Sequence, residues 1–260
     1  MSGTRVPPPA GAAGTPRQVA VPVADLMETP RGARARQLVI GEEVCVVEDR
    51  AGWSRVTCAR DGYAGHLPTG ALTDGPAPTH RVHVRATHLY TAPDVKARER
   101  HALSHGSRLH VTAQDGRFAE TPHGFVPRVH LCPIDQADTD PVAVAELYLG
   151  TPYLWGGNSA FGLDCSGLVQ AGCLACGLPC PGDSDQQENT LGQTLAADAP
   201  LRRGDLLFWR GHVAWVADET RLLHANAHAM AVAFEDTGAA IARIDAQGDG
   251  PVTRRARLTA

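Results

Sequence analysis

The feature that most restricts what this chain can fold into is an internal repeat in its first half. Two stretches have the same four features in the same order: a proline, a glycine, an aromatic residue and a GxxP motif. The matching positions are Pro30 and Pro93, Gly41 and Gly106, Trp53 and Phe118, and residues 65–68 (GHLP) and 124–127 (GFVP). In both, short alternating runs such as VCVVE and RLHVTA lie between Gly and Asp turns, which is typical of strands in small barrels. The repeat predicts two small all-β barrels, residues 19–78 and 79–134, joined by the turn-rich GPAPTH.

After residue 134 the pattern changes, and a different domain is predicted over residues 135–260. DPVAVAELYLG has apolar residues at helical spacing behind the cap Asp140 and a proline at the first helical position, so it predicts a helix. A second helix is predicted from about residue 164 to 176, where Gly177 and Pro179 stop it. RGDLLFWR, HVAWVAD and RLLHANA predict short strands. Helices followed by strands indicate an α+β domain.

Composition and charge exclude several classes of protein. A hydrophobic content of 43% and a net charge of -4 fit a globular protein without the basic surface that nucleic acid or an anionic membrane selects. Residues 1–18, rich in Pro, Gly and Ala, predict a flexible lead-in without a signal-peptide core. No later stretch approaches the roughly 18 apolar residues of a membrane span. The seven cysteines are an odd number and suit a reducing compartment, so we expect a cytoplasmic protein.

A candidate nucleophile lies in PYLWGGNSAFGLDCSGLVQAGC. Asp164 occupies a helix N-cap position, which places Cys165 in the first helical turn. The free N–H groups and the helix dipole there favour an anion, so they predict a lowered thiol pKa and could also stabilise an oxyanion beside the sulfur. The alternative is a buried structural cysteine, the more common fate of a thiol.

Two predicted strands carry candidate partners for this thiol. His212 begins HVAWV, and His224 lies in the next strand, so two side chains on the same face can touch across a spacing of about 4.8 Å. A cysteine nucleophile needs an imidazole that takes its proton and a polar group that orients the imidazole. His228 is the alternative for the orienting role. Any single one of the twelve histidines is otherwise expected to be structural or exposed.

These motifs resemble a known family of enzymes. PYLWGG, LDCSGLV, RRGDLLFW, HVAWVAD and LLHANA, in this order over roughly residues 141–258, are similar to the NlpC/P60 motif series, and the repeated β modules resemble bacterial SH3-like domains. The resemblance implies a papain-like α+β catalytic domain preceded by two SH3-like barrels. It also implies a Cys-His-His triad that cleaves peptide bonds of bacterial cell-wall stem peptides. Cys165 matches the nucleophile, His212 the base and His224 the third residue.

The domain order is similar to that of γ-D-glutamyl-L-diamino acid endopeptidases of murein recycling. That resemblance implies a closed end of the cleft, where acids and a tyrosine hold the free amine of the substrate's L-Ala. The matching positions are Glu28, Tyr63, Tyr153, Asp164, Ser166 and Asp183. Ordinary roles are open for several of them: a helix cap for Asp164, an exposed turn acid for Glu28 and a barrel-core aromatic for Tyr63.

The expected activity is hydrolysis of the bond between γ-D-Glu and a diamino acid (diaminopimelate or Lys) through a thioester. The expected substrate is a murein peptide with a free N-terminal L-Ala, and we expect a monomer without metal or other cofactor, nucleic-acid partner or membrane partner. Cys173, Cys176 and Cys180 lack the second half of a zinc site. Two alternatives remain open: an exported hydrolase that digests intact wall, and a non-catalytic protein that binds murein peptides.

Overall fold

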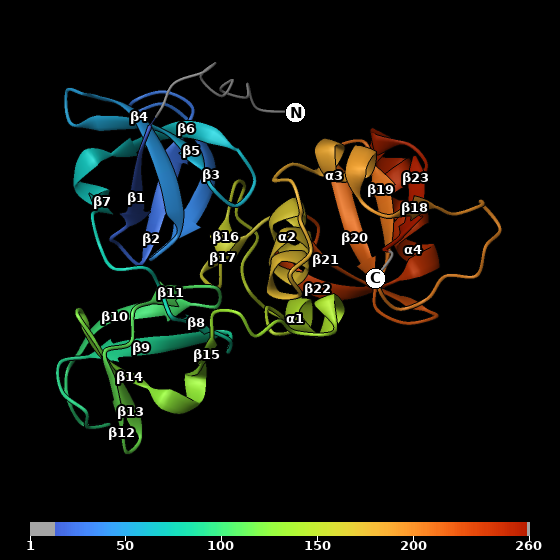
Figure 1. The fold of residues 1–260 in the computed structure, drawn as a ribbon. Helices are drawn as coiled ribbons and strands as arrows, with labels where there is room; N and C mark the ends of the chain where they lie inside the picture. Colours follow the sequence, from blue (N-terminus) through green and yellow to red (C-terminus); the bar gives the residue numbers. More distant parts are fainter. Residues whose placement is uncertain (1–13, 259–260) are drawn as a thin grey trace. The chain divides into compact units, whose positions relative to one another are not determined.

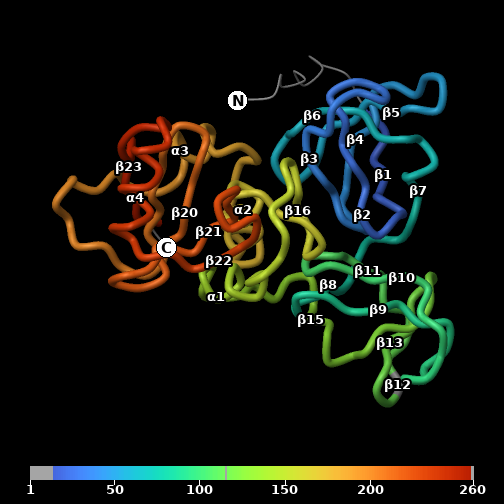
Figure 2. Tube along the Cα trace, turned by 180° about the vertical axis from the view of Figure 1, so that it is seen from behind, coloured from blue at the N-terminus to red at the C-terminus, as the bar shows by residue number. Residues whose placement is uncertain are grey.

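The computed structural model describes residues 14–258, and the chain divides into two compact units, one ending at Ala137 and one beginning at Asp138 (Figure 1 and, from behind, Figure 2). Most of the expected lead-in, residues 1–13, lies outside the described residues. The end of the lead-in was predicted wrongly, because Thr15–Gln18 already pair with Glu43–Val46 as a strand. Within residues 14–258 no helix has the length and apolar character needed to cross a membrane.

The first barrel is a single antiparallel sheet. Its strands are β1 (Thr15–Val19), β2 (Val23–Met27), β3 (Arg34–Val39), β4 (Glu43–Arg50), β5 (Trp53–Cys58), β6 (Ala64–Pro68) and β7 (Leu72–Thr73), in the order β3-β2-β6-β5-β4-β1-β7. The predicted alternation of buried and more exposed side chains is confirmed in β4, where Val44 and Val46 are buried and Cys45 is half-buried. These valines join Leu26, Leu38 and Val56 in one apolar core.

The second β module follows the same plan with a different sheet division. One sheet has the order β10-β9-β14-β13-β12, and the other has the order β11-β8-β15. Their strands are β8 (His80–Val82), β9 (Ala86–Tyr90), β10 (Glu99–Ser104), β11 (Arg108–Leu109), β12 (Ala113–Asp115), β13 (Phe118–Thr121), β14 (Gly124–Pro127) and β15 (Leu131–Pro133). The repeated motifs keep their places: GHLP and GFVP each end a strand before a 3₁₀ turn, η1 (Thr69–Ala71) and η2 (Arg128–His130).

The two β modules share part of one core. Ile40 of the first module packs in the apolar cluster of the second, beside Val82 and Leu103. The N–H of Arg108 donates to the Ile40 carbonyl at 2.8 Å. Gly41 is required at this junction, because its φ is +77° and an added Cβ would lie 2.1 Å from the Arg108 carbonyl oxygen.

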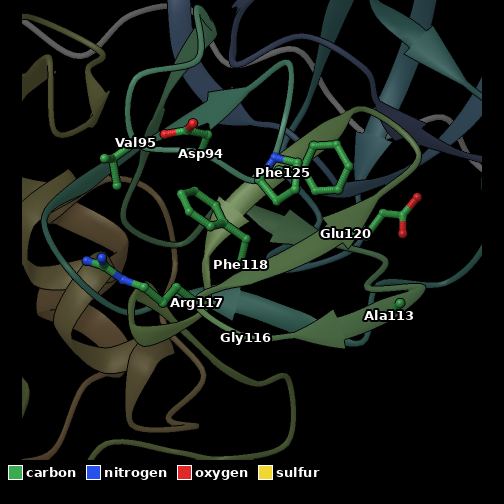
Figure 3. A pocket seen from close by; sticks show the side chains of 9 residues that line it. Asp94, Val95, Ala113, Gly116, Arg117, Phe118, Glu120 and Phe125 are labelled. Atoms are coloured by element: carbon green, nitrogen blue, oxygen red, sulfur yellow. The ribbon is translucent and has the colours of Figure 1, made fainter.

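A surface hollow lies on the second module (Figure 3). Phe118 and Phe125, from neighbouring strands, face it together with Val95 and Asp94 of the loop before β10. All of its lining residues belong to this module, and none is a candidate site residue.

The unit that begins at Asp138 is built of helices and an antiparallel sheet. Its helices are α1 (Pro141–Glu146), α2 (Cys165–Ala175), α3 (Ser184–Thr190) and α4 (Thr237–Ile244), and α4 continues into a turn, η3 (Asp245–Asp249), in which Gly248 has a φ of +96°. Its strands are β16 (Asn158–Ser159), β17 (Gly162–Leu163), β18 (Gln193–Thr194), β19 (Asp205–Trp209), β20 (His212–Val216), β21 (Arg221–Asn226), β22 (Ala231–Asp236) and β23 (Arg254–Arg257). The two predicted helices and three predicted strands are confirmed, with α1 ending before the expected Gly150.

Packing around the larger sheet positions the candidate site. The sheet has the order β18-β23-β19-β20-β21-β22, and α2 packs against β20 and β21 (Figure 1). Helix α4 packs against β21 and β22, and its Ala240 and Ile244 belong to the same buried apolar cluster as Leu222 of β21 and Trp209 of β19. The N-terminus of α2 therefore reaches the start of β20, and α4 covers neighbouring strands.

Candidate active site

Cys165 is the first residue of α2 and lies against the start of β20. Its Sγ is 4.0 Å from the carbonyl oxygen of Gly211, and the N–H groups of Val213 and Ser166 also act on the sulfur. The side chain is 6% exposed. The thiol thus lies next to the backbone on both sides of His212.

Asp164 is the N-cap that holds this helical turn. Its Oδ1 accepts hydrogen bonds from the Gly167 N–H at 2.6 Å and the Ser166 hydroxyl at 3.0 Å, and its Oδ2 accepts from the Gly156 N–H at 2.9 Å. The cap interpretation of Asp164 is therefore confirmed. The same contacts tie the glycine loop to the helix that carries Cys165.

Strand register brings His212 and His224 together. Trp215 pairs with Leu223, so His212 and His224 both lie on the opposite face from that pair, because successive side chains alternate. Nε2 of His212 is 2.8 Å from Nδ1 of His224. His228, the alternative orienting residue, lies exposed in the turn after β21. Geometry therefore favours His224 as the residue that orients His212.

Burial keeps this cysteine and histidine pair neutral. Burial raises the pKa of the Cys165 thiol to about 12, and the Asp164 carboxylate adds to the rise, while backbone N–H groups act against it. Burial also lowers the pKa of His212 to about 3. The expectation that the helix N-terminus lowers the thiol pKa is corrected here, because loss of hydration outweighs the N–H groups. The thiol must give up its proton as it reacts.

Two residues that were not predicted extend the histidine pair. Oε2 of Glu235, on β22, is 3.0 Å from Nε2 of His224, and Arg243 of α4 contacts both oxygens of this carboxylate at 2.8 Å. The alternating run AVAFED next to RLLHANA is a signal that could have indicated this strand. The position of Arg243 depends on how α4 packs, which the sequence pattern does not show.

The remaining predicted residues of this unit divide into two groups. Tyr153 lies near Cys165 and Asp164, since burial first and then both of these groups raise the pKa of its phenol. Ser166 is buried beside Asp164. Asp183, by contrast, is half-buried at the N-cap of α3, and its carbonyl accepts the Gln187 N–H at 2.9 Å. The structure thus places Tyr153, Asp164 and Ser166 with the nucleophile.

Glu28 and Tyr63 belong to the first barrel. The half-buried Glu28 follows β2, and its carbonyl is 3.2 Å from Nδ1 of His66. Tyr63 packs against the barrel core, and the Arg36 guanidinium lies 5.5 Å from its ring centre. The ring of Tyr63 therefore has a packing role within its own barrel.

The neutral state of His224 predicts how stability depends on pH. Burial lowers its pKa from 6.5 in the unfolded chain to about 4 in the folded chain. Between these two values the unfolded chain binds a proton at this histidine and the folded chain does not. Full stability is expected above pH 6.5, with a loss of about 3 kcal/mol in the free energy of unfolding at pH 4 from this group. Denaturant titrations from pH 7 to 4 would measure it. A smaller slope is expected in His224→Gln and an unchanged slope in His228→Ala; equal slopes in all three proteins would contradict the assignment.

Comparisons with known proteins agree with this division of the chain. Residues 150–243 match the NlpC/P60 family, and residues 26–72 match the bacterial dipeptidyl-peptidase Sh3 domain. A γ-D-glutamyl-L-lysine dipeptidyl-peptidase of Bacillus cereus is 26% identical over 231 residues, covering 73% of this chain and 66% of that protein. A protein of the same name from Bacillus subtilis is 30% identical over 192 residues, covering 66% of this chain and 63% of that protein. The matches thus span slightly less than two thirds of each relative.

A solved structure resembles nearly the whole chain. The crystal structure of an NlpC/P60 family protein from Bacillus cereus superimposes with a TM-score of 0.79, covering 95% of this chain and 100% of that one. At 20% sequence identity this likeness shows a shared fold.

Proposed function

Since the chain carries an NlpC/P60 cysteine peptidase domain and a bacterial Sh3 domain, we propose that it hydrolyses the bond between γ-D-Glu and a diamino acid in murein peptides. The observation that carries the proposal is the thiol of Cys165 at a helix N-terminus, against the backbone on both sides of His212, whose ring is hydrogen-bonded to His224. Substrate class is supported by the relatives, whose names specify γ-D-glutamyl-L-lysine. Diaminopimelate and Lys are both candidates for the diamino acid.

The proposed reaction has two steps. His212 takes the Cys165 proton as the sulfur attacks the γ-carbonyl carbon of D-Glu, and backbone N–H groups at the start of α2 stabilise the oxyanion. The C–N bond then breaks, His212 returns the proton to the leaving amine, and a thioester remains on Cys165. Water, deprotonated by His212, hydrolyses the thioester and restores the thiol.

We further propose that the substrate's free N-terminal amine is bound close to Asp164, Tyr153 and Ser166. The buried Asp164 carboxylate already accepts three hydrogen bonds, which keep it in place as an acceptor, and a substrate ammonium group would add a charge-assisted contact to it. Resemblance alone also assigns Asp183, Glu28 and Tyr63 to this role, and for these three we retain it as a proposal.

Hydrolysis of two matched peptides tests the proposal. L-Ala-γ-D-Glu-L-Lys should be cleaved to L-Ala-D-Glu and Lys, whereas the N-acetylated peptide should lose roughly 1–3 kcal/mol of transition-state stabilisation, because it has no ammonium group. Mass spectrometry of the products and kcat/KM for both peptides provide the measurement. The Glu28→Ala variant should lose activity only on the free-amine peptide if Glu28 binds the amine. Equal cleavage of the two peptides would contradict amine recognition, and no cleavage of either would contradict the substrate class.

The biological setting follows from the substrate in our proposal. Short peptides with a free L-Ala arise after the wall has been broken down, so the enzyme would act in recycling inside the cell. We also propose that it acts as a monomer. Release of peptides from intact sacculi, at a rate similar to that on free tripeptide, would instead support the wall-hydrolase alternative.

We also infer that the catalytic domain is papain-like and that the second β module is a further SH3-like domain, with boundaries near residues 78 and 134. A helix carrying the nucleophile against a sheet carrying the base supports the first inference. The repeated glycines support the second, since Gly41 and Gly106 have nearly equal φ values of +77° and +81°.

A further inference from the structure

The histidine pair is continued by an ion pair between β22 and α4. His224 pairs with Ala233 in the sheet, and Glu235 lies two residues further along, so its side chain is on the same face as His224. The contact of 3.0 Å joins Oε2 of Glu235 to Nε2 of His224. His224 thus uses both ring nitrogens, Nδ1 toward His212 and Nε2 toward Glu235.

Arg243 keeps Glu235 an ionised carboxylate. Its Nε and one terminal nitrogen donate to the two carboxylate oxygens, each at 2.8 Å. These hydrogen bonds, followed by the effect of His224, hold the pKa of Glu235 below its usual value. An ionised carboxylate only accepts hydrogen bonds, so the proton in the contact with His224 must be on Nε2.

The proton on Nε2 of His224 also determines which nitrogen of His212 carries a proton. A neutral imidazole carries one proton, so His224 with a proton on Nε2 has an acceptor at Nδ1. Nε2 of His212 must then donate to it, which leaves Nδ1 of His212 without a proton. Both rings are neutral because burial lowers their pKa values, to about 3 for His212 and about 4 for His224. The charged or titratable groups acting on them are Glu235, Arg243 and His228.

We propose that Glu235, held by Arg243, is a positioning residue that sets the tautomers of His224 and His212 and so makes Nδ1 of His212 the nitrogen that takes the Cys165 proton. The proposal rests on the proposed function, in which His212 is the base. When that proton arrives, His212 becomes an imidazolium whose Nε2–H still donates to His224. Glu235 then provides the negative charge at the end of the chain.

The test compares variants in the full-length protein. Glu235→Ala removes the acceptor, Glu235→Asp retains a carboxylate, and Glu146→Ala is the control, because Glu146 forms a similar ion pair with Arg203 at 2.7 Å without a histidine. We expect Glu235→Ala to lower kcat by roughly 10- to 100-fold with little change in KM, because the wrong tautomer becomes populated. Glu235→Asp should recover part of the loss, and Glu146→Ala should be unaffected.

Ring-nitrogen NMR of protein with ¹⁵N-labelled histidine gives a readout that does not need a substrate. Signals are assigned with His212→Gln and His224→Gln, and both rings should be protonated at Nε2 in the unaltered protein. In Glu235→Ala they should become mixtures of tautomers. A proton on Nδ1 of either ring in the unaltered protein, or unchanged tautomers in Glu235→Ala, would overturn the proposal. The tautomers in the unaltered protein test the proposal even if Glu235→Ala does not fold. Absence of peptidase activity in the unaltered protein would instead count against the proposed function.

Discussion

Cys165→Ala is expected to abolish hydrolysis of γ-D-glutamyl peptides while leaving the fold intact. Removal of the sulfur removes the atom that forms the acyl intermediate in the proposed reaction, and loss of a nucleophile of this kind lowers kcat by at least about 10⁴-fold. The side chain is small and starts a helix whose cap is Asp164, so stability should change little. Product formation over hours and a thermal unfolding curve provide the two measurements.

A matched control variant shows whether the loss of activity is specific to Cys165 or follows from removing any buried thiol of α2. Cys173 lies on the same helix and is fully buried, so Cys173→Ala removes a thiol of equal size away from the site. We expect Cys173→Ala to retain activity at the cost of some stability. Residual turnover in Cys165→Ala close to that of the unaltered protein would disprove the cysteine mechanism.

His212→Ala is expected to cost nearly as much as loss of the nucleophile. The thiol pKa of about 12 leaves almost no thiolate at neutral pH, so the reaction depends on a base that takes the proton during attack. A decrease in kcat of about 10³- to 10⁴-fold is expected. Reaction of Cys165 with iodoacetamide at pH 7 should slow in the same variant, which separates loss of thiol activation from loss of substrate binding.

Two further variants rank the histidines. His224→Ala should cost less than His212→Ala, because it removes orientation rather than the proton acceptor, and His228→Ala should have little effect, because His228 is exposed. Greater damage from His228→Ala than from His224→Ala would transfer the orienting role to His228.

Local patterns predicted the part of the site that local structure determines. Asp164 before an apolar run predicted the cap and the helix, and HVAWV and RLLHANA predicted adjacent strands, so the 2.8 Å contact between His212 and His224 follows from register. The catalytic roles of these residues stay predictions. Neither Glu235 nor the thiol pKa could be predicted, because the first depends on the pairing of β21 with β22 and the second on how deeply Cys165 is buried. Sequence alternation shows which face a residue is on, but not how much water reaches it.

The junction at Ile40 and Gly41 limits how genes for chains of this kind can be rearranged. A recombination that copied the second β module alone would leave its core without Ile40 and would open a cavity beside Val82. A larger residue in place of Gly41 would force the Arg108 backbone away and damage both modules at once. The two modules are therefore expected to be inherited, duplicated and lost as one segment.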